Sequence, residues 1–356
     1  MPIPLENILY SARRYNASDI HLIAGLPPTW RVNGEIVIAD AEPFSAEELR
    51  AMIIAQLNDE QKSVLHKEMA LCYSQNINDF GRFRISIYFR NGSPEMAIRT
   101  CSDQILTRVE LGLPVTIDQL LEKPSGLILV TGPTGSGKTT TLNYMIDSIN
   151  SSRKCKIITI EDPIEYVHYH KKALVVQQEL YTDVTSFNTG LTHILRQDPD
   201  VIGIGEMRNF DTIATALTAA ETGHLVIATL HTSSVTQTVE RIVDVFPPEQ
   251  QPQISLQLAN SLQGIITQQL LPTIDKKSRV LAYEMIVIDN AARHIIRENE
   301  SYKLYSLLET GAKKGAVTMD SSLCALYEKG LVGYDTVLSK ATHPDSIRLK
   351  YNRSEV

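Results

Sequence analysis

The sequence predicts an α/β protein of two domains, on three observations. A chain of 356 residues is longer than one average domain of roughly 100–150 residues, and 43% hydrophobic with 21% charged residues is a globular balance. The first hundred residues carry short alternating runs separated by turn residues, which is typical of a small α/β module. Beyond residue 126, near-continuous apolar runs alternate with helical patterns, which favours a mainly parallel sheet covered on both faces.

The first part of the chain is expected to form an α/β domain over residues 1–112. Residues 5–15 have helical spacing, and Ser45 followed by Glu48 indicates a capping box that opens a helix through Leu57. A further helix is expected at 59–69, and Asn33-Gly34 is a hairpin signal. Strands are expected at residues 20–22, 29–32, 36–38, 83–89 and 96–100.

The second domain is expected over residues 113–356, with the boundary near Gly112 and a C-terminal helical region. Strands are predicted at residues 126–130, 157–160, 201–204, 225–230 and 280–288. In open parallel sheets the ligand lies beyond the carboxyl ends of the strands. The residues from His343 onward are polar, and we expect them to be loosely ordered.

A phosphate-binding motif follows the first of these strands. The sequence GPTGSGKT satisfies GxxxxGK[ST], the P-loop or Walker A pattern, directly after a strand and before a helix over 140–149. Lys138 is expected to reach the β and γ phosphates of ATP, or the β-phosphate of ADP, and the Thr139 hydroxyl to bind Mg²⁺. The predicted nucleotide-binding residues are Gly132, Pro133, Thr134, Gly135, Ser136, Gly137, Lys138, Thr139 and Thr140.

Carboxylates close two of the predicted strands. Glu161 and Glu165 lie in the segment TIEDPIE, and Glu206 follows the strand at 201–204. Gly205 stands where a Walker B strand usually has its Asp, so we expect Glu206 to reach Mg²⁺ through water. Its expected task is to orient or deprotonate the attacking water.

Two histidines bracket the strand at 225–230. His231 lies at its carboxyl end, where the nucleotide is expected, and there it could sense the γ-phosphate. His224 opens the strand at the other end and is equally compatible with a packed or helix-capping histidine.

Taken together, these motifs resemble the secretion-type ATPases. GPTGSGKTTT, TIEDPIEY, RQDPDVIGIGEMRN and ALTAAETGHLVIATLHT are similar to the family's Walker A, Asp box, Walker B and His box. The resemblance covers residues 5–335 and is closest to the PilT-type retraction ATPases of type IV pili. Supporting features are a short N-terminal domain at the start of the chain, no CxxC pair for a tetracysteine zinc insert, and the segment AARHIIRE, similar to AIRNLIRE. Ala292, His294 and Asn209 depart from the family patterns.

The resemblance implies a homohexamer of subunits with a PAS-like N-terminal domain and a RecA-like ATPase domain that binds ATP and Mg²⁺. It gives catalytic roles to Glu206, to Glu161 and Glu165 of the Asp box, and to His224 and His231. Arg82, Arg84 and Arg99 resemble the family's phosphate-sensing arginines, and the sequence does not choose among them.

The implied function is pilus retraction by removal of pilin at an inner-membrane platform protein. The implied location is the cytoplasmic face of that membrane, with indirect membrane contact and with an assembly ATPase or a paralogous retraction ATPase as a further partner. An accessory or regulatory paralogue, in a type IV pilus or in a type II or IVB secretion system, is the alternative. A nucleic-acid motor is disfavoured, because 34 Lys+Arg against 41 Asp+Glu give a net charge of −7 without a basic block.

Overall fold

The computed structural model describes residues 4–32, 34–77, 81–101 and 104–351. The chain divides into two compact units. The N-terminal unit comprises Met1–Ile105, Ile160–Tyr169 and Gln177–Gly190, and the C-terminal unit comprises the rest. The boundary that we predicted near Gly112 stays a prediction. The grouping of two later segments with the N-terminal unit was not foreseen.

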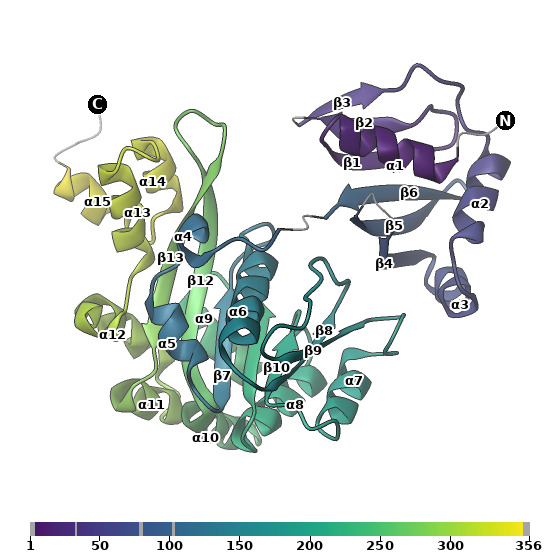
Figure 1. Cartoon of the computed structure of the whole chain (residues 1–356). Helices are drawn as coiled ribbons and strands as arrows, with labels where there is room; N and C mark the ends of the chain where they lie inside the picture. The colour runs from purple at the N-terminus through teal and green to yellow at the C-terminus, as the bar shows by residue number, and fades with distance from the viewer. Residues whose placement is uncertain (1–3, 33, 78–80, 102–103, 352–356) are drawn as a thin grey trace. The chain divides into compact units, whose positions relative to one another are not determined.

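The N-terminal unit is built on a six-stranded sheet of antiparallel pairs in the order β3-β2-β1-β6-β5-β4 (Figure 1). Its helices are α1 (Leu5–Arg14), α2 (Ala46–Ala55) and α3 (Asp59–Glu68). Its strands are β1 (Ala17–Leu22), β2 (Thr29–Val32), β3 (Glu35–Ile38), β4 (Ala70–Asn76), β5 (Arg82–Arg90) and β6 (Ser93–Thr100). β2 and β3 form the expected hairpin, although Asn33 of its turn lies outside the described residues. The capping box of Ser45 and Glu48 is confirmed.

Alternation along β5 separates the two faces of this sheet. Phe83, Ile85 and Ile87 are fully buried in a core shared with α1 and α2, whereas Arg82 and Arg84 occupy the alternate positions. Arg84 and Arg99 are directly paired across β5 and β6, so both belong to the same face of the sheet. The period of two in this strand therefore gathers all three candidate arginines on the face opposite the core.

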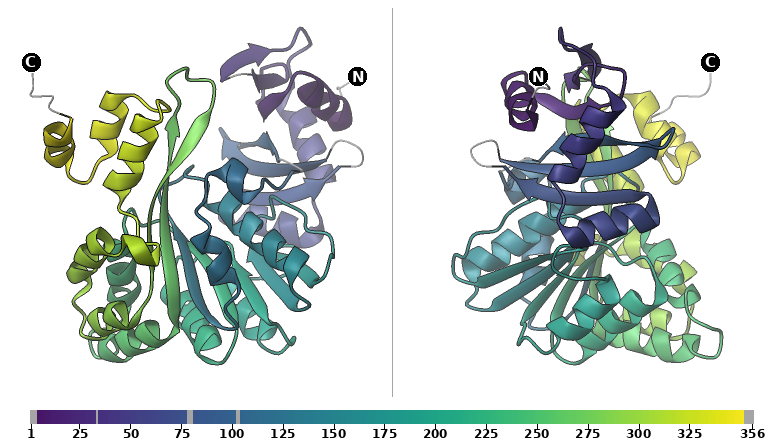
Figure 2. Two further views of the ribbon diagram at one scale, coloured as in Figure 1. Left: turned by 60° about the vertical axis from the view of Figure 1, so that its left-hand side comes forward. Right: turned by 90° about the vertical axis from the view of Figure 1, so that its right-hand side faces the viewer.

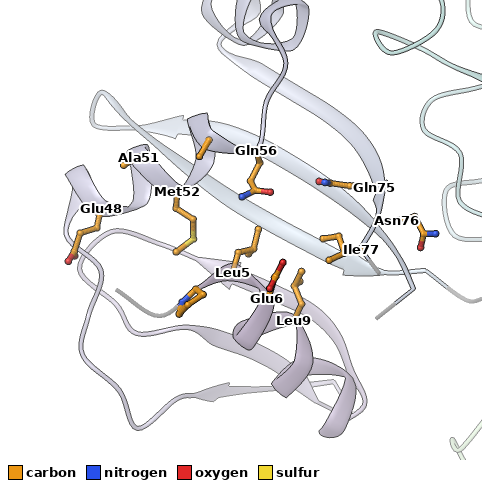
Figure 3. A pocket seen from close by; sticks show the side chains of 12 residues that line it. Leu5, Glu6, Leu9, Glu48, Ala51, Met52, Gln56, Gln75, Asn76 and Ile77 are labelled. Atoms are coloured by element: carbon orange, nitrogen blue, oxygen red, sulfur yellow. The ribbon is translucent and has the colours of Figure 1, made fainter. Parts of the chain in front are cut away.

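A cavity of about 570 Å³ opens in the N-terminal unit. Figure 3 shows it bounded by Leu5 and Leu9 of α1, Met52 of α2 and Gln75 near the end of β4. Its walls combine apolar side chains with a few polar ones and contain none of the predicted site residues.

The C-terminal unit is built on a seven-stranded sheet in the order β13-β12-β7-β11-β10-β8-β9 (Figure 1). β10, β11, β7 and β12 are parallel neighbours, and β12 pairs with β13 antiparallel. The strands are β7 (Gly126–Thr131), β8 (Lys156–Glu161), β9 (Leu174–Glu179), β10 (Val201–Ile204), β11 (Leu225–Leu230), β12 (Leu262–Pro272) and β13 (Arg279–Val287). The carboxyl ends of β8 and β9 are grouped with the N-terminal unit. The predicted α/β class, with a mainly parallel second sheet, is confirmed.

Helices cover this sheet on both faces. All six residues of β7 are buried, and Ile128 and Val130 pack against the apolar side of α6. The helices before and around the sheet are α4 (Arg108–Leu111), α5 (Thr116–Leu121), α6 (Lys138–Ser152), α7 (Phe187–Ile194), α8 (Phe210–Glu221), α9 (Val235–Asp244) and α10 (Gln251–Ser261). Within the described residues, no helix is long and apolar enough to cross a bilayer.

The chain continues through C-terminal helices, and the last of them, coloured yellow in Figure 2, pack beside the β12–β13 hairpin. They are α11 (Asn290–Arg297), α12 (Leu304–Thr310), α13 (Met319–Glu328), α14 (Tyr334–Lys340) and α15 (Pro344–Lys350). Our expectation of loose order after His343 was wrong for α15. Ile347 is buried, and Lys350 and Tyr351 bond to the carboxylate of Glu328, so few but specific contacts order this polar helix.

Candidate nucleotide site

The P-loop connects β7 to α6 through backbone that requires glycine. Gly137 caps α6 at φ 91°, and Gly132 has φ 142°. A Cβ atom on Gly132 would lie 2.4 Å from the carbonyl oxygen of Gln268 and 2.6 Å from Oγ of Ser136. No side chain fits there, so the tight turn over the sheet edge depends on glycine at this position.

Lys138, the first residue of α6, lies folded into its own loop. Its Nζ donates to the carbonyl oxygens of Gly132, at 2.8 Å, and Pro133, at 3.0 Å. The same Nζ lies 3.4 Å from Nδ1 of His231. Burial lowers the pKa of Lys138, although the nearby Glu206 carboxylate opposes that shift.

The loop has the donors that a nucleotide phosphate needs. Ser136 Oγ is buried and has no partner within the described residues, so it is a polar atom without a hydrogen bond inside the loop. Lys138 is bonded to two carbonyl oxygens that phosphate oxygens can replace, and the N-terminus of α6 faces the loop. Pro133, Thr134 and Gly135 are exposed at the rim. Thr139 follows Lys138 at the start of α6, the position at which a P-loop threonine or serine could hold Mg²⁺.

Glu206 directly follows the turn after β10 and lies at the same edge as the P-loop. The backbone of this turn is fixed to β11, because Thr229 Oγ1 donates to Gly205 O at 2.5 Å and Met207 N donates to Thr229 O. The Glu206 carboxylate lies 2.9 Å from Arg208 Nη2. Burial raises the pKa of Glu206, but Arg208 and then His231 outweigh it and hold the pKa below its usual range. Glu206 is therefore a charged acceptor at neutral pH.

His231 connects the two groups. It follows β11, and its Nε2 lies 3.2 Å from Oε1 of Glu206. Lys138, His231 and Glu206 thus form a continuous polar chain across the carboxyl ends of β7, β11 and β10. The structure brings these three predicted residues together, as the sequence reasoning expected for His231.

His224 lies at the opposite end of β11. Its carbonyl oxygen accepts from Gly126 N at the start of β7, and its Nδ1 is 2.9 Å from the carbonyl oxygen of Ala219 near the end of α8. Within this chain it therefore contacts the C-terminus of a helix and does not approach Glu206. The helix-capping alternative describes this position, and a catalytic role for His224 stays a prediction.

Among the candidate arginines, Arg82 bonds to other residues of its own unit. Its Nε donates to Ile164 O at 2.6 Å, and its Nη2 donates to Glu179 Oε2 at 2.9 Å and to Ser74 Oγ. The side chains of Arg82 and Glu179 are only 15% and 3% exposed. Glu179 also accepts from the backbone amides of Ser74 and Ile164. Arg82 is thus held by a buried network.

The other predicted residues of the N-terminal unit have fewer partners. Arg84 Nη1 lies 3.0 Å from Glu165 Oε1, and these side chains are 37% and 28% exposed. Arg99 pairs with Asp19 at 2.8 Å near the surface. Glu161 is buried and accepts from Gln177 Nε2 at 2.9 Å. The structure therefore pairs Arg84 with Glu165, whereas Arg99, its neighbour on β6, forms a different ion pair with Asp19.

Sequence reasoning missed two acidic residues. Glu179 and Glu284 are both buried, and each accepts backbone hydrogen bonds from segments distant in sequence. One local feature of the sequence could have indicated them: each is a carboxylate within or directly after an apolar, strand-like run. No group of three or more His, Cys, Asp or Glu side chains that could hold a metal occurs in the described part of the chain.

Comparison with known proteins relates this chain to secretion-type ATPases. Residues 110–319 match the family described as Type II/IV secretion system protein. The chain is 41% identical to the type IV pilus retraction ATPase PilT of Pseudomonas aeruginosa, over 96% of this chain and 98% of that protein. It is 35% identical to the type IV pilus ATPase PilU of the same organism, over 97% and 90%. A crystal structure of the pilus retraction motor PilT with bound ADP superposes with a TM-score of 0.89 at 41% identity, covering 97% and 99% of the two chains.

The fold and the P-loop with its neighbouring carboxylate define a P-loop ATPase. The chain belongs to the Type II/IV secretion system protein family, among its PilT-like ATPases.

Proposed function

We propose that this chain is a hexameric motor that hydrolyses ATP to retract type IV pili, and so powers twitching motility. The observation that carries the proposal is the convergence of Lys138, His231 and Glu206 at one sheet edge. The likeness to a retraction ATPase over almost the entire length of both chains adds support.

The site residues suggest how hydrolysis would proceed. Lys138 would exchange its two loop carbonyls for phosphate oxygens, with the amides of the loop as further donors. Glu206, ionised at neutral pH, would orient a water for in-line attack and accept its proton. His231 would hold the Glu206 carboxylate in place. Thr139 would hold Mg²⁺, with Glu206 behind bridging water, and the bound cation supplies charge neutralisation at the phosphates.

The proposed motor acts on protein partners. It would assemble as a homohexamer at the cytoplasmic face of the inner membrane and work on the platform protein, with an assembly ATPase or a second retraction ATPase beside it. An overall charge of −7 without a basic block fits protein substrates better than nucleic acid. Membrane contact would be indirect, through the platform protein.

An accessory paralogue is the second candidate, favoured by the similarity to PilU and by changes in the retraction-like segment of α11. Ala292 is fully buried, whereas the side chain of His294 is 70% exposed, so one change affects packing and the other affects surface chemistry. Asn209 is a different case. Its Oδ1 accepts from Thr212 N at the start of α8, a capping role that Asp also fills.

Complementation of a retraction-deficient deletion strain tests the proposal. The wild-type chain should restore twitching, and Glu206→Ala should not. Glu249→Ala, at an exposed position outside the site, is the matched control and should restore it. If the wild-type chain restores twitching only when another retraction ATPase is present, the accessory candidate replaces the main motor. ATP turnover stimulated many-fold by DNA or RNA would contradict both.

A further inference from the structure

A buried carboxylate joins two helices behind the nucleotide site. Glu284 lies on β13 opposite Thr267 of β12, and only 3% of its surface is exposed. Its Oε1 accepts the backbone N–H of Val235 at 2.7 Å, and the backbone N–H of Met319 lies close enough to the carboxylate to lower its pKa. No part of the proposed chemistry uses this residue.

Val235 and Met319 hold equivalent positions, because each is the first residue of its helix. The amides of a first helical turn have no partner within the helix. Ser234 caps α9 by accepting from Gln237 N, and Thr318 caps α13 by accepting from Ser321 N. Neither cap uses the first amide of its helix. Glu284 bonds to the first amide of α9 and lies near the first amide of α13, where the helix dipoles favour a negative charge.

The segment between His231 and α9 is tied to that helix. Thr232 Oγ1 lies 2.7 Å from Thr238 Oγ1, and Ser233 Oγ donates to Gln237 Oε1 at 2.7 Å. Since the segment is bonded to the first turns of α9, fixing the start of α9 also fixes the segment that carries His231.

We propose that Glu284 is a positioning residue for ATP hydrolysis: by bonding to the first amide of α9 it sets His231 against Glu206, and by facing the first amide of α13 it links this arrangement to the C-terminal helices. The proposal rests on the proposed function and extends it. Burial raises the pKa of Glu284, while the backbone amides of Val235 and Met319 oppose that shift.

A double-mutant cycle tests the proposal through steady-state ATP turnover of the full-length protein. Glu284→Gln retains one acceptor oxygen but presents an amide N–H₂ to the second helix. We expect it to lower kcat about ten- to a hundredfold, because displacement of a group by about 1 Å costs rates of this order, while the KM for ATP changes less than about twofold. In a His231→Ala background the same substitution should lower kcat less than about threefold. Glu284 is proposed to act on Glu206 through His231, and that contact is already absent in this background.

Two controls separate positioning from general stability. Glu95, equally buried and paired with Arg90 at 2.6 Å in the N-terminal unit, provides the control Glu95→Gln, whose effect should be the same in both backgrounds. The loss in Tm caused by Glu284→Gln should also be the same with and without His231. If Glu284→Gln does not fold, Glu284→Asp, a shorter carboxylate, takes its place in the cycle.

An unchanged kcat in Glu284→Gln, or an equal fold-loss in both backgrounds, would overturn the inference while the proposed function stands. A wild-type chain without ATP turnover, or a Glu206→Gln variant as active as wild type, would overturn the proposed function and this inference with it.

Discussion

Nε2 of His231 lies 3.2 Å from Oε1 of Glu206, so the imidazole after β11 contacts the carboxylate after β10. The other ring nitrogen, Nδ1, lies 3.4 Å from Nζ of Lys138. His231 thus connects the P-loop lysine to the carboxylate that we propose to activate water.

Replacement of Glu206 by Gln removes the base and keeps the shape of the side chain. We expect kcat for ATP hydrolysis to fall about 10²- to 10⁴-fold, the usual contribution of general-base catalysis, with little change in KM. Steady-state phosphate release measures both. A variant that retains more than a tenth of the wild-type kcat would show that Glu206 is not the base.

The pH dependence of turnover should report Glu206. Its pKa in the folded protein lies below the usual value, so the ionised form is present at neutral pH and is lost as the pH falls through the lowered pKa. Arg208→Ala removes the largest lowering influence, so the acid limb of kcat/KM should move to higher pH. Arg208→Lys keeps the charge and should move it less. An acid limb at the same pH in all three proteins would contradict the assignment.

Two glycines of the P-loop make a matched pair. Gly132 and Gly135 both have positive φ, but a Cβ on Gly135 meets nothing within 4 Å, whereas one on Gly132 overlaps Gln268 O. Gly135→Ala should therefore cost only backbone strain of about 1–3 kcal/mol. Gly132→Ala must also displace the backbone of β12, so it should lower Tm further and abolish ADP binding. Thermal unfolding and titration with a fluorescent ADP analogue check this, and wild-type affinity in Gly132→Ala would refute it.

Substitution of Arg82 and of Arg84 on β5 should have different effects on stability and on ATP turnover. Arg82→Ala leaves the buried Glu179 carboxylate without its cation and should destabilise the protein by about 3–5 kcal/mol. The half-exposed Arg84–Glu165 pair is worth about 1 kcal/mol or less, so Arg84→Ala should leave Tm almost unchanged. If Arg84 senses phosphate, that variant should instead lose kcat. Unfolding and turnover, measured on both variants, decide the matter. A stable, inactive Arg82→Ala would reverse the two roles.

Replacing Ala292 and His294 of α11 by the residues common in the motif should change the stability of the protein by different amounts. Ala292→Ile adds three carbons at a fully buried position and should destabilise by about 1–3 kcal/mol through overpacking. His294→Asn, at an exposed position, should change stability by less than about 0.5 kcal/mol. Chemical denaturation compares the two with wild type. A more stable Ala292→Ile would reveal spare volume beneath α11.

The parts of the site that the sequence predicted are those with local causes. Gly132 to Thr139 run from the end of a strand into the first turn of a helix, so eight consecutive residues determine the loop. Glu206 and His231 were predictable because each closes an apolar strand, and parallel strands bring their carboxyl ends to one edge.

The remaining parts depend on partners that no local pattern reveals. Arg82 was a candidate phosphate sensor by its residue type, but its environment is set by Glu179, 97 residues later. His224 was ambiguous until its contact with Ala219 placed it at the end of α8. Glu284 stands within an apolar strand-like run, but that pattern does not reveal its partner, because the partner is a backbone amide, which almost every residue possesses.

The dependence of Arg82 on Glu179 has a consequence for synthesis on the ribosome. At about 5–20 residues per second, the 97 residues between them take roughly 5–20 s to translate. During that interval β5 carries a cation whose burial partner does not yet exist, so the N-terminal unit cannot complete its packing as a nascent domain. The apolar core of this unit comes from residues 5–98, so a chain released before residue 179 should collapse around that core with the Arg82 network incomplete.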